Sequence, residues 1–443
     1  TAPAYGLFQV YADEYPGFRA QMGYSREDYW AFVDRHVAAL GIHFTRSNLV
    51  FIWGFLEPEV GASFVWADAS LPEEAVVMPD IVLPAVFAPA PGKQMDFLAV
   101  LEPARERGVP VERQELYPRG REAEWERYVR AAVERYDSDG VEDGPPGVRV
   151  RHWQVMNEPF ISLETGFLTV EEYAELARMT ARAVRAADPQ ARVVLGDTGR
   201  FTLEVIAALG GEGIFDAIDV HFYPLDLSPA SAGLPLLRRA LDEHGYGAAE
   251  IWMTELGTWV HQPPPPPDSL ELAPHTEADQ ARFLIQAMLG NRALGVARIL
   301  WAPGLVAWSN LGFFNYMGLV SSGVDSGDEA ADVGRERIAY HAYRRLVAET
   351  ETDVADLIGL RAGSTPALAV VELRSRVDGQ AFFVAWTDGA SASIELPWGA
   401  PGARVTNLVP DASGRFTEST VTATGGLLSV AVDPDPRLIK PQE

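Results

Sequence analysis

The sequence contains no cysteine and only two lysines, Lys93 and Lys440, among its 443 residues. Without cysteine the chain forms no disulfide, no thiolate nucleophile and no cysteine-ligated zinc site. Positive charge is scarce, since 36 Lys and Arg stand against 62 Asp and Glu, a net charge of −26. Nucleic acids and anionic membrane surfaces bind proteins with clustered positive charge. We therefore expect neither as a partner, and we expect a neutral substrate.

Long apolar runs, phosphate-binding loops and the common metal motifs are also missing. The most apolar stretch, Ala75–Pro91, is interrupted by Asp80 and by four prolines, which excludes a membrane span there. No glycine-rich phosphate loop follows an apolar run, which argues against a dinucleotide-binding protein. No His-Glu-x-x-His occurs, and the first apolar run lacks the His-x-His of many barrel metalloenzymes. The sequence thus predicts no cofactor and no metal.

The first 350 residues alternate short apolar runs with longer amphipathic stretches, the pattern of parallel strands that are each followed by a helix. Eight strands are predicted, at Tyr5–Val10, Ile42–Asn48, Val109–Leu116, Val148–Met156, Arg192–Gly196, Ala217–Phe222, Glu250–Thr254 and Ala297–Trp301. The predicted helices are Arg26–Leu40, Asp96–Arg107, Glu122–Tyr136, Val170–Ala187, Leu203–Leu209, Leu234–His244, Glu277–Leu294 and Arg335–Val347. We therefore predict an α/β fold, a (β/α)8 TIM barrel, for residues 1–350.

Residues 351–443 have a different pattern, with short apolar runs between turn signals such as Asp378-Gly379 and no long helical stretch. The runs are Ala367–Leu373, Ala381–Thr387, Ser391–Leu396, Ala403–Leu408 and Leu427–Val432. They predict a small C-terminal β-sandwich domain. Two further segments, a long irregular loop Glu57–Gln94 and the proline run Pro263–Pro267, are expected above the barrel mouth.

Two glutamates follow predicted strands four and seven. Strand four leads into Asn157-Glu158-Pro159, and strand seven leads into Glu255. In a barrel these strands lie on opposite sides of the mouth, so the two side chains can face one bound group. Glycoside hydrolysis needs such a pair, because one carboxyl protonates the leaving oxygen while the other attacks the anomeric carbon or activates water. The sequence predicts Glu158 and Glu255 as this catalytic pair.

Polar residues at other strand ends complete the predicted site. His221 and Tyr223 alternate along strand six and therefore lie on one side of it. Tyr223 is expected to hydrogen-bond Glu255 and help to keep it anionic. Arg46 on strand two is expected to place a positive charge near Glu255.

Three tryptophans are candidates for stacking on a sugar ring. Trp301 ends strand eight and is expected to form an aromatic floor. Trp53 and Trp259 follow strand ends and either stack on sugars or fill the cores of loops.

These residues resemble the site of the retaining glycoside hydrolases of clan A. Asn157-Glu158-Pro159 is similar to the acid/base motif of the clan, and Thr254-Glu255-Leu256-Gly257 is similar to its nucleophile motif. The resemblance implies that Glu158 is the general acid/base, that Asn157 binds the sugar 2-hydroxyl and that Glu255 is the nucleophile. It also implies substrate-binding roles for Arg46, His221, Tyr223 and Trp301.

Within the clan, the barrel followed by a sandwich resembles family 39, as do Gly318-Leu319-Val320 and the following Tyr340-His341-Ala342-Tyr343. That family includes β-xylosidases, iduronidases and exopolysaccharide hydrolases. We therefore predict a retaining glycosidase that cleaves O-glycosidic, β-linked bonds of neutral oligo- or polysaccharides by double displacement.

The sequence leaves several alternatives open. One is a carbohydrate-binding protein without turnover, although two mutually repelling carboxylates argue against it. Exo or endo action, the oligomeric state and a sugar-binding role for the sandwich stay open, and the lack of an exposed aromatic row favours packing for the sandwich. Polysaccharide degradation would place the enzyme outside the cytoplasm; no signal peptide is visible, and a cytoplasmic location stays open.

Overall fold

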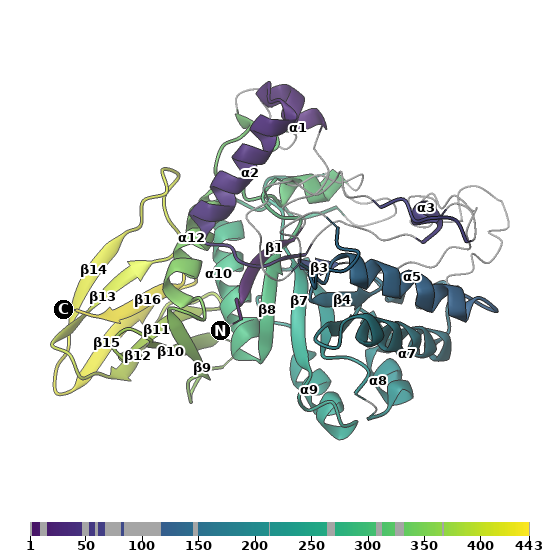
Figure 1. The fold of residues 1–443 in the computed structure, drawn as a ribbon. Coiled ribbons are helices and arrows are strands. Elements are labelled where there is room, and N and C mark those ends of the chain that lie inside the picture. The colour runs from purple at the N-terminus through teal and green to yellow at the C-terminus, as the bar shows by residue number, and fades with distance from the viewer. Residues whose placement is uncertain are drawn as a thin grey trace.

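The computed structural model describes residues 2–8, 16–46, 53–57, 61–66, 81–83, 117–144, 149–211, 213–263, 271–306, 312–323, 332–365 and 367–442. Eight parallel strands close into a barrel in the order β1 to β8, with helices around it (Figure 1). The strands are β1 (Tyr5–Phe8), β2 (Thr45–Arg46), β3 (Ile81–Leu83), β4 (His152–Val155), β5 (Arg192–Leu195), β6 (Ala217–Phe222), β7 (Glu250–Leu256) and β8 (Val296–Trp301). The predicted (β/α)8 barrel is confirmed.

The helices differ in length and in how they begin. They are α1 (Pro16–Met22), α2 (Arg26–Leu40), α3 (Trp53–Leu56), α5 (Glu122–Arg135), α6 (Pro159–Glu164), α7 (Val170–Ala187), η2 (Gly199–Phe201), α8 (Thr202–Leu209), α9 (Leu234–Glu243), α10 (Glu277–Ala293), η3 (Gly312–Tyr316) and α12 (Ile338–Thr350). In α7, Thr169 accepts from the backbone of Glu172 while the Glu172 carboxylate accepts from the backbone of Thr169. Ser25 and Thr276 begin α2 and α10 in the same way. Such caps stabilise a helix by about 1 kcal/mol. Within the described residues, no helix has the length and apolar character needed to cross a membrane.

One barrel strand lies where the sequence predicted a loop. β3 pairs in parallel with β2 through Ile81 and with β4 through Val82. The third strand of the barrel is therefore β3 and not the predicted Val109–Leu116, and the loop predicted for Glu57–Gln94 contains a strand. Val109–Leu116 and the helix predicted at Asp96–Arg107 lie outside the described residues. Prolines and an aspartate flank the apolar run of β3, and these turn-forming neighbours hide a short strand in the sequence.

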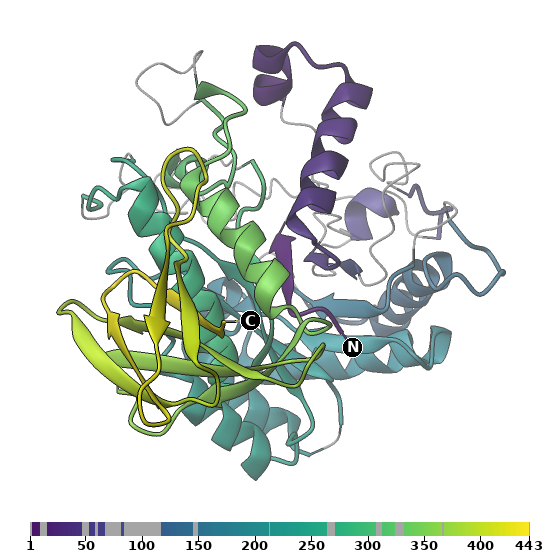
Figure 2. The same ribbon diagram turned by 90° about the vertical axis from the view of Figure 1, so that its left-hand side faces the viewer.

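The C-terminal β-sandwich consists of two antiparallel sheets beside the barrel (Figures 1 and 2). One sheet has the strand order β14-β13-β16-β11-β10-β9, and the other pairs β12 with β15. The strands are β9 (Ala355–Leu360), β10 (Leu368–Ser375), β11 (Ala381–Thr387), β12 (Ala392–Pro397), β13 (Gly402–Asn407), β14 (Glu418–Thr422), β15 (Leu427–Val432) and β16 (Arg437–Pro441). The five predicted runs are confirmed as strands, whereas β9, β14 and β16 were not predicted.

The central strand β11 of the larger sheet is buried on both faces. Phe382, Val384 and Trp386 lie in the core shared with the barrel, whereas Phe383 and Ala385 lie in the core between the two sheets. Alternate residues of a strand point to opposite faces, so one apolar run serves two cores. The sandwich is thereby packed against the barrel.

Hydrogen bonds join the sandwich to α10 and to the start of the barrel. Arg282 Nε donates to Asp435 Oδ1 at 2.9 Å, and Gln286 Nε2 donates to the carbonyl of Pro434 at 2.7 Å. The Glu351 carboxylate accepts from two backbone amides at the start of the chain. Because one core continues from the barrel into the larger sheet, a domain boundary at residue 350 stays a prediction.

Candidate active site

Glu158 lies just beyond the end of β4. β4 ends at Val155, Met156 has a positive φ of 63°, and Pro159 begins the short helix α6. Proline suits the first helical position because its φ is already fixed near the helical value and it has no N–H to satisfy. This turn places Glu158 at the start of α6 with its side chain 25% exposed.

Hydrogen bonds and close packing with α7 and with the residue after β5 fix the backbone at the end of β4. The buried Tyr173 hydroxyl of α7 donates to the carbonyl of Val155 at 2.9 Å and accepts from the amide of Gly196 at 3.2 Å. A Cβ at Gly196 would lie 2.2 Å from the carbonyl oxygen of Met156, so only glycine fits there. The backbone that carries Glu158 is therefore firmly positioned.

Glu255 lies inside β7, where its side chain is 9% exposed. Arg46 Nη1 donates to its Oε1 at 2.6 Å, and the Tyr223 hydroxyl donates to its Oε2 at 2.8 Å. Both contacts were predicted from the sequence. Burial is the largest influence and raises the pKa of Glu255; His221 and Arg46 oppose the rise, and Glu158 adds to it. The surrounding donors therefore favour the ionised carboxylate against the effect of burial.

Arg46 connects the two sides of the site. It is fully buried, and besides Glu255 its guanidinium donates to Gln154 Oε1 at 2.9 Å and to Asn157 Oδ1. It also lies over the ring of Phe8, 4.8 Å from the ring centroid. A planar guanidinium holds several acceptors in fixed directions, so Arg46 orients Asn157 beside Glu158.

His221 of β6 lies between the two carboxylates. Its Nδ1 is 2.8 Å from Glu158 Oε1 and 3.5 Å from Glu255 Oε2, and its Nε2 is 3.2 Å from Asp219 Oδ2. Burial lowers the pKa of His221, but the charges of Glu255 and Asp219 outweigh it and raise this pKa well above its usual value. The imidazole is therefore protonated and donates from both ring nitrogens.

The sequence analysis missed Asp219, which is fully buried behind His221. It accepts from the Thr254 amide at 2.9 Å, the Thr254 hydroxyl at 2.5 Å and Gln154 Nε2 at 3.0 Å. Burial raises the pKa of Asp219, but His221 and Arg46 more than offset this, and the net pKa is lowered. The available signal was its spacing, because a residue two positions before His221 lies on the same face of the strand.

Asp197, which follows β5, was also missed. It is 8% exposed and accepts from the amide of Gly199 at 2.9 Å and from the amide of His221 at 3.3 Å. Burial, with further contributions from Asp219 and Glu158, raises the pKa of Asp197 to about 6. No motif of the sequence marks this residue, since it reaches the site only through the fold.

The two carboxylates are close together. One oxygen of Glu158, one of Glu255 and a ring nitrogen of His221 lie within 4.8 Å of one another. The short distance between the oxygens of Glu158 and Glu255 is compatible with the carboxyl separation of about 5–5.5 Å in retaining glycosidases. It is smaller than the separation of roughly 6.5–9.5 Å in inverting ones. Three such atoms also resemble a metal site, but a protonated His221 has no free lone pair and Arg46 already supplies positive charge. The residues fit a sugar-cleaving pair better than a metal centre.

The three tryptophans predicted to bind sugar are all buried. Trp301 is 0% exposed, and Trp53 and Trp259 are each 1% exposed. The Trp301 ring nitrogen donates to a backbone carbonyl, Trp259 stacks on His275, and Trp53 packs in the main core. None of these three indoles therefore presents an open face to a sugar, and a stacking role stays a prediction.

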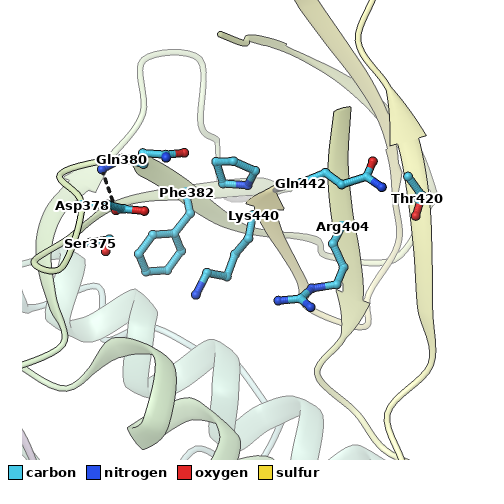
Figure 3. A pocket seen from close by; sticks show the side chains of 9 residues that line it. Ser375, Asp378, Gln380, Phe382, Arg404, Thr420, Lys440 and Gln442 are labelled. Atoms are coloured by element: carbon cyan, nitrogen blue, oxygen red, sulfur yellow. Dashed lines mark hydrogen bonds between the residues drawn. The ribbon is translucent and has the colours of Figure 1, made fainter. Parts of the chain in front are cut away.

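A separate pocket lies in the sandwich (Figure 3). Its lining is largely polar and includes Arg404, Asp378 and Lys440. Lys440 Nζ lies 5.2 Å from the ring centroid of Phe382, and that ring is only 2% exposed. An aromatic ring that is buried under a lysine offers no surface for stacking on a sugar. The pocket therefore gives no support to a sugar-binding sandwich.

Comparison with models of protein families gave no match, and neither did comparison with curated protein sequences. Solved structures do match. A family 39 glycoside hydrolase from Bacteroides cellulosilyticus WH2 has a TM-score of 0.63 at 15% identity, over 99% of this chain and 81% of that one. A family 39 β-xylosidase from Caulobacter crescentus has a TM-score of 0.57 at 17% identity, over 100% and 98%.

A third similar structure is the family 51 α-L-arabinofuranosidase AbfB from Bifidobacterium longum. Its TM-score is 0.56 at 13% identity, over 98% of this chain and 94% of that one. At such identities the similarity establishes the fold alone. The chain has the fold of glycoside hydrolases of families 39 and 51.

Proposed function

We propose that this chain is a retaining glycoside hydrolase that cleaves β-linked O-glycosidic bonds of neutral oligo- or polysaccharides. The observation that carries the proposal is the pair Glu158 and Glu255, with oxygens within 4.8 Å of each other and in different surroundings. The fold shared with families 39 and 51 supports it. The resemblance of the motifs around both glutamates to those of clan A points to the same chemistry.

In the first step, Glu255 attacks the anomeric carbon while Glu158 gives its proton to the leaving oxygen. The glycosidic bond breaks, and an ester forms between the sugar and Glu255. Arg46 and Tyr223 hold the attacking carboxylate in place and favour its ionised form until the ester forms. The phenol of Tyr223 keeps its proton for this purpose, because burial and the charge of Glu255 raise its pKa well above the usual value.

In the second step, Glu158 takes a proton from water as the water oxygen attacks the anomeric carbon. The ester bond breaks, Glu255 leaves as a carboxylate, and the sugar is released with its original configuration. His221 donates to Glu158 and so stabilises the carboxylate that is present between the two steps. We assign Asp219 as the positioning residue that keeps His221 protonated and oriented.

The proposed substrate class rests on the net charge of the chain and on the position of Asn157. A chain with a net charge of −26 repels anionic polymers, which favours neutral sugars. Asn157, oriented by Arg46, is placed beside Glu158 and is proposed to bind the sugar 2-hydroxyl. A polysaccharide substrate would place the enzyme outside the cytoplasm.

The proposal is tested with aryl β-glycosides of xylose, glucose, galactose and mannose, together with neutral plant polysaccharides. We expect hydrolysis of at least one, with the β-anomer as the first product in a proton NMR time course. The E158Q/E255Q double variant serves as the blank for contaminating hydrolases. First release of the α-anomer would contradict double displacement. Binding of oligosaccharides without turnover would favour the non-catalytic alternative.

A further inference from the structure

Two phenylalanines lie in the short helix η3, which follows β8 on the side of the barrel mouth. Phe313 and Phe314 are both half-buried, and their rings stack on one another with centroids 4.2 Å apart. They also pack on a small buried cluster formed by Trp259, Leu272 and Met317. The pair therefore has a packed base and leaves apolar ring surface open to solvent.

Two contacts connect this pair with the proposed nucleophile. The rings of Phe314 and Tyr223 meet edge to face, with centroids 5.3 Å apart and an angle of 75° between the ring planes. The hydroxyl of the same tyrosine donates to Glu255 Oε2 at 2.8 Å. The side chain of Tyr223 thus joins Phe314 to Glu255, and a sugar ring held at Glu255 has the phenylalanines beside it.

Hydrogen bonds from three directions hold η3 in place. The Trp301 indole donates to the carbonyl of Met317 at 2.9 Å, and Gln280 Nε2 donates to the same carbonyl at 3.2 Å. The amide of Val260 donates to the carbonyl of Tyr316 at 3.0 Å. These donors come from β8, from α10 and from the segment after β7. Because η3 is fixed before a ligand arrives, binding to it costs less conformational entropy than binding to a loose segment.

The open ring surface suits the apolar face of a sugar. A pyranose whose hydroxyls are equatorial, such as xylose or glucose, presents C–H groups on both faces of its ring and hydroxyls around its edge. Aromatic side chains supply a large, flat apolar area for such a face. The hydroxyls at the edge then stay available to polar groups of the site, such as Asn157.

We propose that Phe313 and Phe314 form the surface on which the sugar ring attacked by Glu255 packs, and that this ring is a pyranose with equatorial hydroxyls. The inference rests on the proposed function for the position of that sugar. Trp301, which the sequence predicted as the aromatic floor, then acts as a positioning residue, since its buried indole holds η3 through Met317. The sugar-binding aromatic surface thus lies in the segment after β8 and not at the end of the strand.

The test measures binding without turnover. Xylotriose and cellotriose are titrated by isothermal titration calorimetry into the E158Q/E255Q double variant of the full chain, which lacks both proposed catalytic carboxylates. We expect at least one trisaccharide to bind. Adding F314A to the double variant should weaken that binding about threefold to tenfold, as expected for the loss of one aromatic contact.

F416A, added to the same double variant, is the control, because Phe416 is also half-buried but lies in the sandwich, where Arg345 covers its ring. It should bind as the double variant does. If F314A fails to fold, F314L replaces it, since leucine keeps apolar volume without a flat ring.

Two results would overturn the inference: neither trisaccharide binds, or the Phe314 variant binds as tightly as F416A. Hydrolysis of an aryl glycoside by the parent protein would in either case leave the proposed function intact. Binding that the Phe314 variant weakens, in a protein that hydrolyses no glycoside, would support the inference and contradict the proposed function alone.

Discussion

The two sides of the barrel mouth hold the same functional group in different surroundings. On the β7 side, Glu255 is 9% exposed and accepts from Arg46 and Tyr223 at 2.6 and 2.8 Å. On the β4 side, Glu158 is 25% exposed, and its close partner among the described residues is His221 at 2.8 Å. Identical side chains acquire different roles through such differences. The enclosed carboxylate suits a nucleophile, and the more open one suits proton exchange with water.

The difference arises from where each glutamate lies along the chain. Glu255 is part of β7 and pairs in register with His221 of β6, so neighbouring strands surround it. Glu158 lies in a turn between β4 and α6, where fewer neighbours cover it. Strand interiors enclose a side chain, whereas turns at the carboxyl ends of barrel strands leave one open to the cleft.

The largest expected effect comes from Glu255. E255Q keeps the size of the side chain but removes the nucleophile, and kcat should fall on the order of 10⁴-fold or more. The fall in kcat is measured from initial rates with the aryl glycoside that the parent protein hydrolyses fastest. E250Q is the matched control, since Glu250 lies at the other end of β7 and pairs with Arg192. Its kcat should stay within about twofold of the parent value. If the kcat of E255Q were close to that of E250Q, Glu255 would not be the nucleophile, and the proposed difference in role between Glu255 and Glu158 would be contradicted.

The loss of activity in the E158Q variant should depend on the leaving group of the substrate. With a poor leaving group, kcat/KM should fall about 10²–10⁴-fold, because general-acid assistance is lost. With a dinitrophenyl glycoside, which leaves without a proton, bond cleavage should be affected far less, and the later attack of water should become the slow step. Stopped-flow release of dinitrophenol separates these steps. Equal losses for both substrates in the first step would contradict an acid role for Glu158.

Y223F removes one donor from Glu255 and leaves the aromatic ring. A hydrogen bond to a charged group contributes about 1.5–3 kcal/mol, so kcat should fall roughly 10–100-fold. KM should change less, because the contact acts on the attacking group. A change confined to KM would show that Tyr223 serves substrate binding instead.

D219N should shift the pH profile more than it lowers the maximum rate. The negative charge of Asp219 favours protonated His221, so its removal lowers the pKa of His221. His221 then loses its proton at lower pH, and with it the hydrogen bond to the Glu158 carboxylate that is present between the two steps. For a substrate whose turnover is limited by the second step, the alkaline limb of the profile of kcat should therefore move down by about one pH unit. D226N, a change at an exposed aspartate in the loop after β6, is the control. An unchanged alkaline limb in D219N would leave Asp219 with a purely structural role.

Much of the site could be predicted because local patterns mark it. Apolar runs end just before Asn157-Glu158-Pro159 and at Glu255, and strand ends on one edge of a barrel must lie together. Arg46 and Tyr223 were expected beside Glu255, and both contacts are present. The catalytic roles themselves stay predictions.

Other features depend on packing that no local pattern records. Asp197 and Asp219 come from neighbouring strands, and their effect on His221 exists only once β5 and β6 are adjacent. The residues of β3 resemble a proline-rich loop, and only pairing with β2 and β4 reveals a strand. The burial of Trp301 likewise depends on the segments that cover it, so its exposure could not be deduced from its position after a strand.

The central claim is that Glu255 is the nucleophile and Glu158 is not. The most direct measurement is the intact mass of the protein after incubation with the 2-deoxy-2-fluoro glycosyl fluoride of the sugar that it hydrolyses, followed by peptide mapping. We predict one added sugar per chain, on Glu255. An adduct on Glu158, or no adduct with a sugar whose aryl glycoside is cleaved, would contradict the account.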